Sequence, residues 1–429
     1  MNTVISLQDR KLEEAEARIE EAERNAYYSR GLALAEIRDE ELWKQRFQQY
    51  TSFREYCEDR WELKESQVYR LMDAALFAAK LPRGGVPLPS NERHIRPLLA
   101  RLDQDEDRII VWRDVLATTN GAKIRTNDVD DAISRFLGLR DKEFVTLDEW
   151  RELDPVGRTA ILSRIGKAHL NEQKDKTDIE WAGWSWNPVT GCLHGCPYCY
   201  ARDIAFNIYP SEVGFGSTIW PNRLTAPANQ KPPVSDNVAD KNIFTCSMAD
   251  LFGRWVPDEW IEKVLETVSL NPQWNFLFLT KFPKRMAEFS IPPNAWMGTT
   301  VDLQARVANA ERAFENVKSS IRWLSIEPMI EPLKFSKLDI FDWIVIGGSS
   351  ASKGTDGTPA TPDWTPPLDW IVDLHQQARA AGCKIYYKTN SGLSGVSRLR
   401  EFPGHTTQPV TAPDVFNYLS NISPKEQVG

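Results

Sequence analysis

The sequence predicts an α/β protein in which a partial (β/α) barrel of the TIM type forms the C-terminal domain and an all-α region precedes it. Three observations support this fold. Residues 9–47 contain no proline and carry apolar residues at spacings of three and four, as amphipathic helices do. Short helical patterns follow up to about residue 140. Beyond residue 178, apolar strands alternate with helical segments, which indicates parallel strands buried on both faces.

The segment 1–48 is predicted to be one long amphipathic helix that ends near Phe47. Its apolar stripe consists mostly of alanine, as at Ala15, Ala22 and Ala26. Two interpretations remain open: the helix packs weakly on a neighbour, or it forms a dimeric coiled coil. A dimer through this helix is therefore one expected partnership.

The segment 49–140 is predicted to form several short helices. Ser66 and Ser90 each stand before an apolar repeat, which is the position of an N-cap residue. A turn of about four residues separates two of these helices and suits a helix-turn-helix. The stretches SFREYCEDRW and SQVYRLMDAA resemble the helix-turn-helix segments of plasmid-partition-like and phage DNA-binding proteins.

If this segment binds DNA, its second helix would enter the major groove, where Gln67, Tyr69 and Arg70 could reach bases or phosphates. Residues 51–140 carry fifteen Lys or Arg and fifteen Asp or Glu, so their charges balance. Phosphate contacts need a basic face that only a fold can gather. DNA binding and protein docking therefore stand as equal alternatives, and the expected partner is DNA or a DNA-bound protein.

Residues 141–177 are predicted as a helical linker, residues 178–400 as the barrel and residues 401–429 as a tail. Seven strands separated by helices favour a closed or partly open barrel over a flat sheet. In such a barrel the chemistry lies at the carboxyl ends of the strands. The predicted strands lie in IEWAGWSW, NIFTCSMADLF, NFLFLTKF, AWMGTTV, IRWLSIEPM, DWIVIGG and KIYYKTN.

Three of the six cysteines lie in TGCLHGCPYCY, the loop that follows the first predicted barrel strand. The chain has a net charge of -8 and no stretch of ~20 apolar residues, so we expect a cytoplasmic protein that does not bind membranes. In a reducing compartment, clustered cysteines are more often metal ligands or catalytic groups than disulfides. Cys57, Cys246 and Cys383 stand singly and are expected to be buried.

The spacing C-x3-C-x2-C brings Cys192, Cys196 and Cys199 together. Three thiolates can bind one 4Fe-4S cluster and leave one iron open to a chelating small molecule. GCLHGCPYCYAR resembles the radical S-adenosylmethionine signature, including the aromatic Tyr198 before the third cysteine. The resemblance implies a 4Fe-4S cluster and S-adenosyl-L-methionine as cofactors, with Tyr198 near the adenine.

More narrowly, residues 178–400 resemble a phage-associated three-cysteine-motif family of unknown substrate. A fainter similarity links them to DNA-repair lyases of the same superfamily. The stretches that carry the family resemblance are IEWAGWSWNPVTGC, SMADLFGRWVPDEWIEKVLE, NPQWNFLFLTKFPKR, WLSIEPMIEPL, DWIVIGGSS and KIYYK.

The cysteine loop is also compatible with two kinds of site that hold no cluster. A structural zinc ion could be bound by the three cysteines together with His194 or Cys246. A redox dithiol formed by the C-P-Y-C pair would leave Cys192 unexplained.

Polar residues that directly follow the barrel strands are candidates for cofactor binding. By the superfamily resemblance, Ser247 and Asp250 would hold the amino group of the cofactor, and Thr299 and Asp302 its ribose hydroxyls. Lys281 and Lys388 also end strands, where they either face the cavity or are solvated.

Glu327 lies at a strand end between two apolar residues, where an ionised carboxylate needs a donor partner. Gly347 and Gly348 would allow a backbone to approach a ligand.

The sequence thus predicts a radical S-adenosylmethionine enzyme that generates a 5'-deoxyadenosyl radical. Its substrate is expected to be a nucleic acid or a DNA-associated protein, for modification or repair. A flavodoxin or ferredoxin is the expected electron donor. The alternative is a non-enzymatic phage or plasmid DNA-binding regulator with a structural zinc loop.

Overall fold

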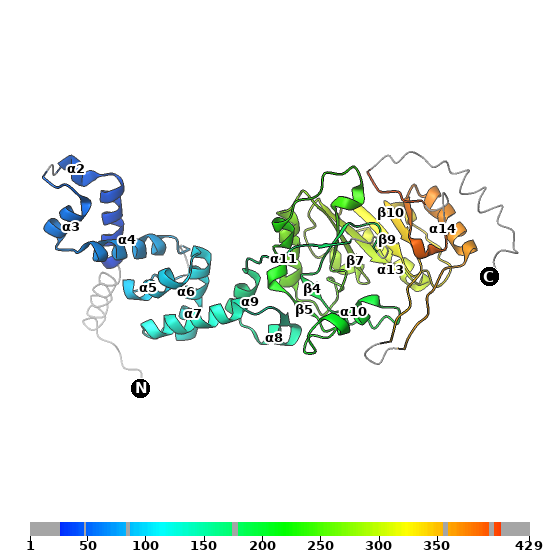
Figure 1. The fold of residues 1–429 in the computed structure, drawn as a ribbon, viewed down its shortest axis with the longest axis horizontal. Coiled ribbons are helices and arrows are strands. Elements are labelled where there is room, and N and C mark those ends of the chain that lie inside the picture. The colour runs from blue at the N-terminus through cyan, green and yellow to red at the C-terminus, as the bar shows by residue number, and fades with distance from the viewer. Residues whose placement is uncertain are drawn as a thin grey trace, which may run out of the picture. The chain divides into compact units, whose positions relative to one another are not determined.

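The computed structural model describes residues 26–46, 49–82, 86–173, 179–354, 359–393 and 399–404. The chain divides into two compact units (Figure 1). Unit 1 consists of Met1–Lys142 with Leu153–Ser163, and unit 2 of Glu143–Glu152 with Arg164–Gly429. The predicted linker is thus shared between the two units. None of the helices in the described ranges has the length and apolar character needed to cross a membrane.

Unit 1 is all-α over its described residues, as the sequence predicted. One apolar cluster gathers side chains of α4 to α7 and α9 around the fully buried Trp112. A second cluster includes Trp43, Tyr56 and Met72. The helices are residues 26–39, α2 (Leu42–Arg46), α3 (Phe53–Trp61), α4 (Glu65–Ala79), α5 (Glu92–Arg101), α6 (Asp105–Thr119), α7 (Thr126–Arg140) and α9 (Pro155–Leu162).

The predicted long first helix is interrupted within the described residues. The chain is helical over 26–39, turns at Glu41, which has a φ of 50°, and resumes as α2. Leu34 and Trp43, on either side of the turn, are both buried in the same cluster of unit 1. The expectation of one continuous helix is wrong here, because the turn lets both segments bury their apolar side chains. The part of that prediction before residue 26 lies outside the described residues.

Two predicted helix caps are displaced by one or two positions. The N-cap of α4 is Lys64, whose backbone N–H donates to Gln67 Oε1 at 3.0 Å, and Ser66 lies inside the helix. The N-cap of α5 is Asn91, whose side chain accepts a backbone N–H of the first turn, and Ser90 precedes it. In α5 the side-chain amide of Asn91 thus makes the capping hydrogen bond that was expected of the Ser90 hydroxyl.

Unit 2 is built on an eight-stranded sheet in the order β11-β10-β9-β8-β7-β6-β3-β2. Seven of these strands are parallel and follow one another in the chain, and each lies in one of the seven predicted segments. The edge strand β2 (Asn171–Glu172) is antiparallel to β3. β2 and β11 are the two edges, so strand pairing does not close the sheet into a barrel. The parallel strands are β3 (Trp184–Trp186), β6 (Asn242–Thr245), β7 (Asn275–Thr280), β8 (Ala295–Thr300), β9 (Ile321–Ile326), β10 (Trp343–Ile346) and β11 (Lys384–Tyr387).

Helices connect the parallel strands, and a small second sheet stands beside the first cysteine. Its order is β1-β5-β4. The helices of unit 2 are α8 (Leu147–Glu152), α10 (Tyr200–Ile208), α11 (Asp258–Ser269), α12 (Pro283–Met286), α13 (Gln304–Phe314) and α14 (Leu368–Ala380). The short sheet consists of β1 (Val145–Thr146), β4 (Val189–Thr190) and β5 (Thr218–Ile219), and 3-10 turns cover Pro221–Arg223, Ala226–Asn229, Val238–Lys241, Leu338–Ile340 and Thr389–Ser391.

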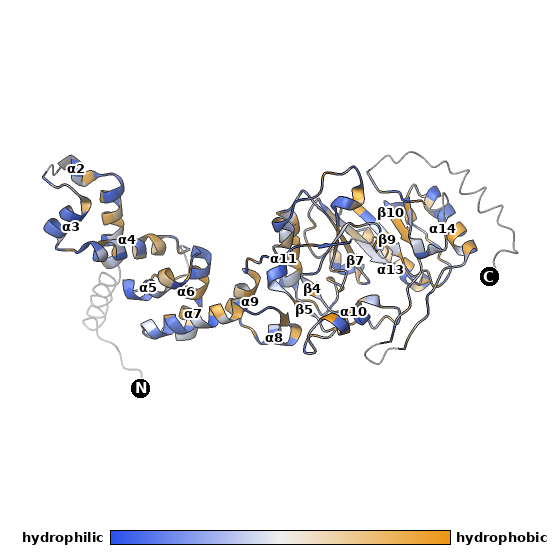
Figure 2. Cartoon of the chain, in the orientation of Figure 1, coloured by the Kyte–Doolittle hydropathy of each residue, from blue (hydrophilic) through white to orange (hydrophobic). Residues whose placement is uncertain are grey.

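One face of the large sheet is covered by tryptophan. The register pairs Leu277 with Trp296 and Trp323 with Trp343, and parallel neighbours of this kind share a face. Trp181 packs among them, and among the described residues this cluster has no member from an α-helix. All four residues of β10 are buried, and most of this strand has the hydrophobic colour in Figure 2. The tryptophans thus line this face of the sheet.

The opposite face packs against helices. Tyr387 of β11 lies on that face, and its hydroxyl is 2.7 Å from His375 Nδ1 of α14. On the tryptophan face, the carboxyl ends of β8 and β9 carry Thr300 and Ser325, which are paired in register. Residues two positions further along, Asp302 and Glu327, extend this face beyond the strand ends. The polar end of the tryptophan face is therefore where the candidate site lies.

Candidate functional site

The three clustered cysteines lie in the loop between β4 and α10. The loop begins at Gly191, whose φ of 84° and close contact with Gly216 O exclude a side chain. Gly191 N–H donates to Met248 O at 2.9 Å, and Cys192 N–H donates to Phe215 O at 3.2 Å. Gly191 also forms an isolated parallel bridge with the segment after β6. The loop therefore starts at a fixed place beside the carboxyl ends of the parallel strands.

All three thiols of the loop are free and partly exposed. Burial raises the pKa of Cys192 to about 12 and also raises the pKa of Cys199. Both side chains pack against the cluster of Ala205 and Met248. Thiols held neutral in this way must lose a proton to become metal ligands.

The single cysteines are buried, as predicted. Cys57, Cys246 and Cys383 are all at most 3% exposed. Burial raises the pKa of Cys246 and of Cys383 to about 12. These residues are inert small side chains of the core.

The donor set of the loop, three thiols close in sequence, is of the kind that binds an iron–sulfur cluster. Throughout the described part of the chain, no group of three or more His, Cys, Asp or Glu side chains is placed to hold one metal ion. His194, a predicted fourth zinc ligand, instead contacts Asp250. A cluster does not need its thiolates to converge on one point, because each binds a different iron. Space is available beside the loop, since no heavy atom beyond its chain neighbours lies within 4 Å of the position that a Cβ of Gly195 would take.

Asp250, which follows β6, uses both carboxylate oxygens within the protein. Oδ1 accepts the hydroxyl of Thr280 at 2.6 Å and the backbone N–H of Phe252 at 3.1 Å. Oδ2 accepts the backbone N–H of Lys281 at 2.9 Å and lies 2.7 Å from His194 Nε2. These contacts make Asp250 a positioning residue that joins the cysteine loop to the ends of β6 and β7.

The ring of His194 is held between two aromatic side chains. Its centroid lies 4.7 Å from that of Phe282 and 5.2 Å from that of Trp255. The guanidinium of Arg254 lies over the outer part of this group, 4.6 Å from the centroid of Phe282. The middle of the cysteine loop is thus anchored on the segments that follow β6 and β7.

Tyr198 lies at the centre of a buried polar network. Its hydroxyl donates to Asp302 Oδ2 and accepts from Lys281 Nζ at 2.7 Å. Lys281 Nζ is also 3.2 Å from Asp302 Oδ2, and Arg306 Nε is 2.6 Å from Oδ1. Burial, followed by the charge of Asp302, raises the pKa of Tyr198. The cysteine loop is therefore linked directly to the strand ends of β7 and β8.

Opposing effects act on Asp302, whose side chain is only 3% exposed. Burial alone would raise its pKa, but Lys281, the hydroxyl of Tyr198 and Arg306 together hold the pKa below its ordinary value. Asp302 is thus an anion with two hydrogen-bond donors, Tyr198 and Lys281, and a nearby cation, Arg306. A ribose hydroxyl would have to join or replace them.

Glu327 has the donor partner that its apolar neighbours require. The ammonium of Lys388, which follows β11, pairs with Glu327 Oε1 and is itself buried. The two residues flank the end of β10, between them in the sheet. Lys281 and Lys388 are therefore not solvated charges, and each pairs with a carboxylate on the tryptophan face.

The two glycines after β10 are packed against other residues of the protein and do not border an open space. A Cβ at Gly348 would overlap Trp364 O, and one at Gly347 would come within 2.7 Å of Asn390 Oδ1. Gly348 and Asn390 also exchange hydrogen bonds of 3.2 and 3.1 Å. The close backbone approach expected here is made by Trp364 and Asn390.

Ser247 and Thr299 are both hydrogen-bonded within unit 2. Ser247 Oγ donates to Asn187 Oδ1 at 3.2 Å, and Thr299 Oγ1 donates to the carbonyl of Thr280 at 2.8 Å. Thr299 is buried and shares its face with Thr280, away from the tryptophans. Of the predicted cofactor residues, Asp302 and Glu327 continue the tryptophan face and Tyr198 bonds to Asp302, whereas Thr299 lies on the other face.

Comparison with known proteins identifies the family of unit 2. Residues 176–404, more than half of the 429, match the family described as "Protein of unknown function (DUF5131)". The chain belongs to this family. No curated protein matches the chain. Among solved structures, that of spore photoproduct lyase complexed with dinucleoside spore photoproduct is similar with 10% identity and a TM-score of 0.32, over 68% of this chain and 96% of that chain. So low a score carries no argument about function.

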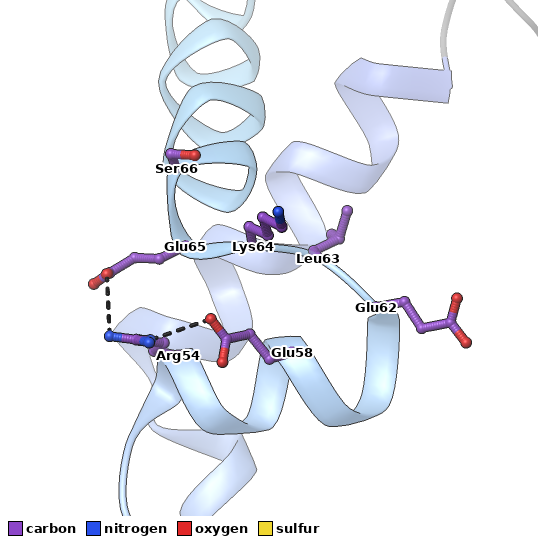
Figure 3. Close-up of a pocket in the computed structure, with 7 residues that line it drawn as sticks. All are labelled: Arg54, Glu58, Glu62, Leu63, Lys64, Glu65 and Ser66. Carbon is purple, nitrogen blue, oxygen red and sulfur yellow. Dashed lines mark hydrogen bonds and ion pairs between the residues drawn. The ribbon is translucent and has the colours of Figure 1, made fainter.

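In this DUF5131 protein, the predicted nucleic-acid residues lie on α4 of unit 1. Tyr69 and Arg70 are exposed, and Gln67 serves as part of the helix cap. Arg70 Nε donates to Ser66 O at 2.8 Å. A surface pocket at the start of α4, drawn in Figure 3, is lined by three carboxylates and two cations. Its lining residues are Arg54, Glu58, Glu62, Leu63, Lys64, Glu65 and Ser66.

Three residues of the DUF5131 site escaped the sequence analysis. Arg306 pairs with Asp302 from one turn along α13, Asn187 accepts from Ser247, and Asn390 binds Gly348. Only Arg306 carried a signal, because it follows Asp302 by four residues at the start of a predicted helix, where opposite charges so spaced can pair. The two asparagines depend on segments that are far apart in sequence.

Proposed function

We propose that this DUF5131 protein is a radical S-adenosylmethionine enzyme. Cys192, Cys196 and Cys199 would hold a 4Fe-4S cluster, and S-adenosyl-L-methionine would bind on the tryptophan face at the carboxyl ends of the strands. The observation that carries this proposal is the direct hydrogen bond from Tyr198, inside the cysteine loop, to Asp302 after β8. A molecule bound next to the cysteine loop could therefore also contact the residues at the strand ends.

A 4Fe-4S cluster held by Cys192, Cys196 and Cys199 would supply the electron for reductive cleavage of S-adenosyl-L-methionine to methionine and a 5'-deoxyadenosyl radical, which would take a hydrogen atom from the substrate. The residues of this chain bind and orient. Tyr198 and Asp302 offer hydrogen-bonding groups for ribose or adenine, and Lys281 keeps the carboxylate ionised. The buried tryptophan cluster provides a water-free apolar surface next to these strand ends.

The substrate that we propose is a nucleic acid or a DNA-associated protein. The support is the helix-turn-helix resemblance of unit 1, in which α3 and α4 are joined by a three-residue turn over 62–64. Exposed Tyr69 and Arg70 could contact a partner. A duplex mobility shift that weakens with salt and with R70A supports DNA; a shift absent even at low salt supports protein docking.

Anaerobic reconstitution tests the enzymatic proposal. Wild-type protein should acquire about four irons and four sulfides per chain, absorb visible light as iron–sulfur clusters do, and cleave S-adenosyl-L-methionine with dithionite. The C192A/C196A/C199A variant should lose the cluster, whereas C57A, which removes a buried thiol of unit 1, should retain it. One tightly bound zinc ion and no cleavage would instead support the structural-loop alternative.

A further inference from the structure

Helix α10, which follows the cysteine loop, exposes an apolar stripe. Tyr200, Ile204 and Ile208 are 45%, 41% and 61% exposed, and their spacing of four places them on one side of the helix. Its other side buries Ala201 and Ala205. The stripe therefore remains uncovered by the described part of the chain.

The stripe lies close to the thiols. The buried side of α10 packs with Cys192 and Cys199 in one cluster, so the stripe is about one helix diameter, roughly 10 Å, from them. Leu193, inside the cysteine loop, is 59% exposed and extends the apolar surface towards the thiols. We call Leu193, Tyr200, Ile204 and Ile208 the α10 surface.

The size of the α10 surface indicates a transient partner. Four partly exposed side chains offer at most a few hundred Å² of apolar area. Stable dimers bury about 1,200 Å² or more, whereas redox encounters lie at the low end of interface sizes. A second copy of this chain therefore fits the surface less well than an electron carrier.

Two exposed cations lie by the segment that anchors the cysteine loop, since Arg254 contacts Phe282, whose ring packs on His194, and Lys284 follows Phe282 by two residues. Over the described ranges neither cation forms an ion pair with a carboxylate. Arg285, by contrast, is held by Asp258 and by backbone carbonyls. Unpaired cations near an interface attract an acidic partner and speed its association.

We infer that the α10 surface, with Arg254 and Lys284 near the cysteine loop, docks a small acidic one-electron carrier protein. This inference rests on the proposed function, because the carrier would deliver the electron to the cluster held by the adjacent cysteines. In that step the carrier loses one electron and the oxidised cluster gains it, and no covalent bond or proton changes place. A carrier docked on these apolar side chains would lie beside the thiols, so its redox group would be close to the cluster.

The test compares two reductants on reconstituted full-length protein. Cluster reduction is followed by absorbance with reduced flavodoxin, an acidic carrier, and separately with dithionite. I204S/I208S should slow reduction by flavodoxin about tenfold and leave reduction by dithionite unchanged. The matched control is I165S/L270S, which changes two exposed apolar residues elsewhere in unit 2 and should behave as wild type.

The charge variant R254E/K284E should also slow reduction by flavodoxin about tenfold, and it should abolish the decrease of that rate with added salt. Equal flavodoxin rates in wild type and both variants overturn the inference, as does a loss of dimer in I204S/I208S without any change in rate. A wild-type protein that assembles no cluster overturns the proposed function itself, and the inference with it.

Discussion

His194 Nε2 lies 2.7 Å from Asp250 Oδ2, and this contact joins the middle of the cysteine loop to the strand ends of unit 2. Asp250 also accepts hydrogen bonds from Thr280, Phe252 and Lys281. A carboxylate can accept from all these donors, whereas an amide presents only one acceptor oxygen. The loop that carries the thiols is therefore positioned by a residue that follows a different strand, β6.

Replacing Asp250 by Asn should destabilise unit 2 by about 2 kcal/mol, because buried donors would face the amide NH2 group. H194Q should reduce the stability of unit 2 by less, since it changes only one of the four contacts of Asp250. Urea unfolding followed by tryptophan fluorescence measures the change, because most tryptophans lie in unit 2. The control is D258N at an exposed ion pair, with an expected effect below about 0.5 kcal/mol. Equal stability of D250N and wild type would contradict this role.

Lys281→Met should cost about 3 kcal/mol at neutral pH, because it leaves the buried Asp302 with one cation fewer. R306M is the matched comparison. Arg306 is 36% exposed, so water can replace its contact and the expected cost is below about 1 kcal/mol. Similar effects of the two substitutions would show that the network is not organised around Lys281.

The Asp302 network also predicts a loss of stability in acid. The folded pKa of Asp302 is lower than its ordinary value of 3.8, so the unfolded state binds the proton more readily. The contribution is present above that value and is lost as the pH falls through the lower folded pKa. In K281M the pKa of Asp302 should rise, and this acid-dependent contribution should shrink. Urea midpoints from pH 5 to pH 2, compared for K281M and R306M, test this expectation.

The strands of unit 2 could be predicted from the sequence because each is a short apolar run bounded by helical periodicity. A parallel sheet buried on both faces requires that pattern, and all seven segments form strands. The loop of Cys192, Cys196 and Cys199 was equally visible, because its spacing is local. The all-α character of unit 1 followed in the same way from periodicity.

What the sequence could not reveal is which polar groups pair across distant segments. Lys388 was indistinguishable from a solvated lysine until the sheet order brought β9 and β11 to either side of β10. The faces of Thr299 and Thr300 depend on strand register, which a single sequence does not contain. The sequence marked Asp250 as a candidate site residue, but it did not show how many hydrogen-bond donors of the protein surround its carboxylate.

His375 predicts a second pH dependence, at milder acidity. Burial, followed by the charge of Arg379, lowers the pKa of His375 from 6.5 to about 4. Between these values the unfolded state binds more protons than the folded state, so stability falls as the pH falls from 6.5 to about 4. The full loss corresponds to about 3 kcal/mol. H375Q should flatten this dependence of the unit 2 unfolding midpoint.

The control for H375Q is H94Q, because His94 is a buried histidine of unit 1 whose pKa is also lowered, first by burial. H94Q should leave the pH dependence of unit 2 unchanged. If H375Q unfolds with the same pH dependence as wild type, His375 is not the group that titrates in this window.

Gly348→Ala should destabilise unit 2 by about 2 kcal/mol, because the added Cβ would overlap Trp364 O. Ser349 and Trp364 exchange backbone hydrogen bonds of 3.0 and 2.9 Å, so displacing Trp364 also strains this bridge. The matched substitution is Gly138→Ala in α7, where nothing lies within 4 Å of the new Cβ. It should stabilise unit 1 by about 0.5 kcal/mol, since alanine favours the helix interior. A G348A protein as stable as wild type would mean that the segment around Trp364 can move away without cost. The contact of this segment with the end of β10 would then not be rigid.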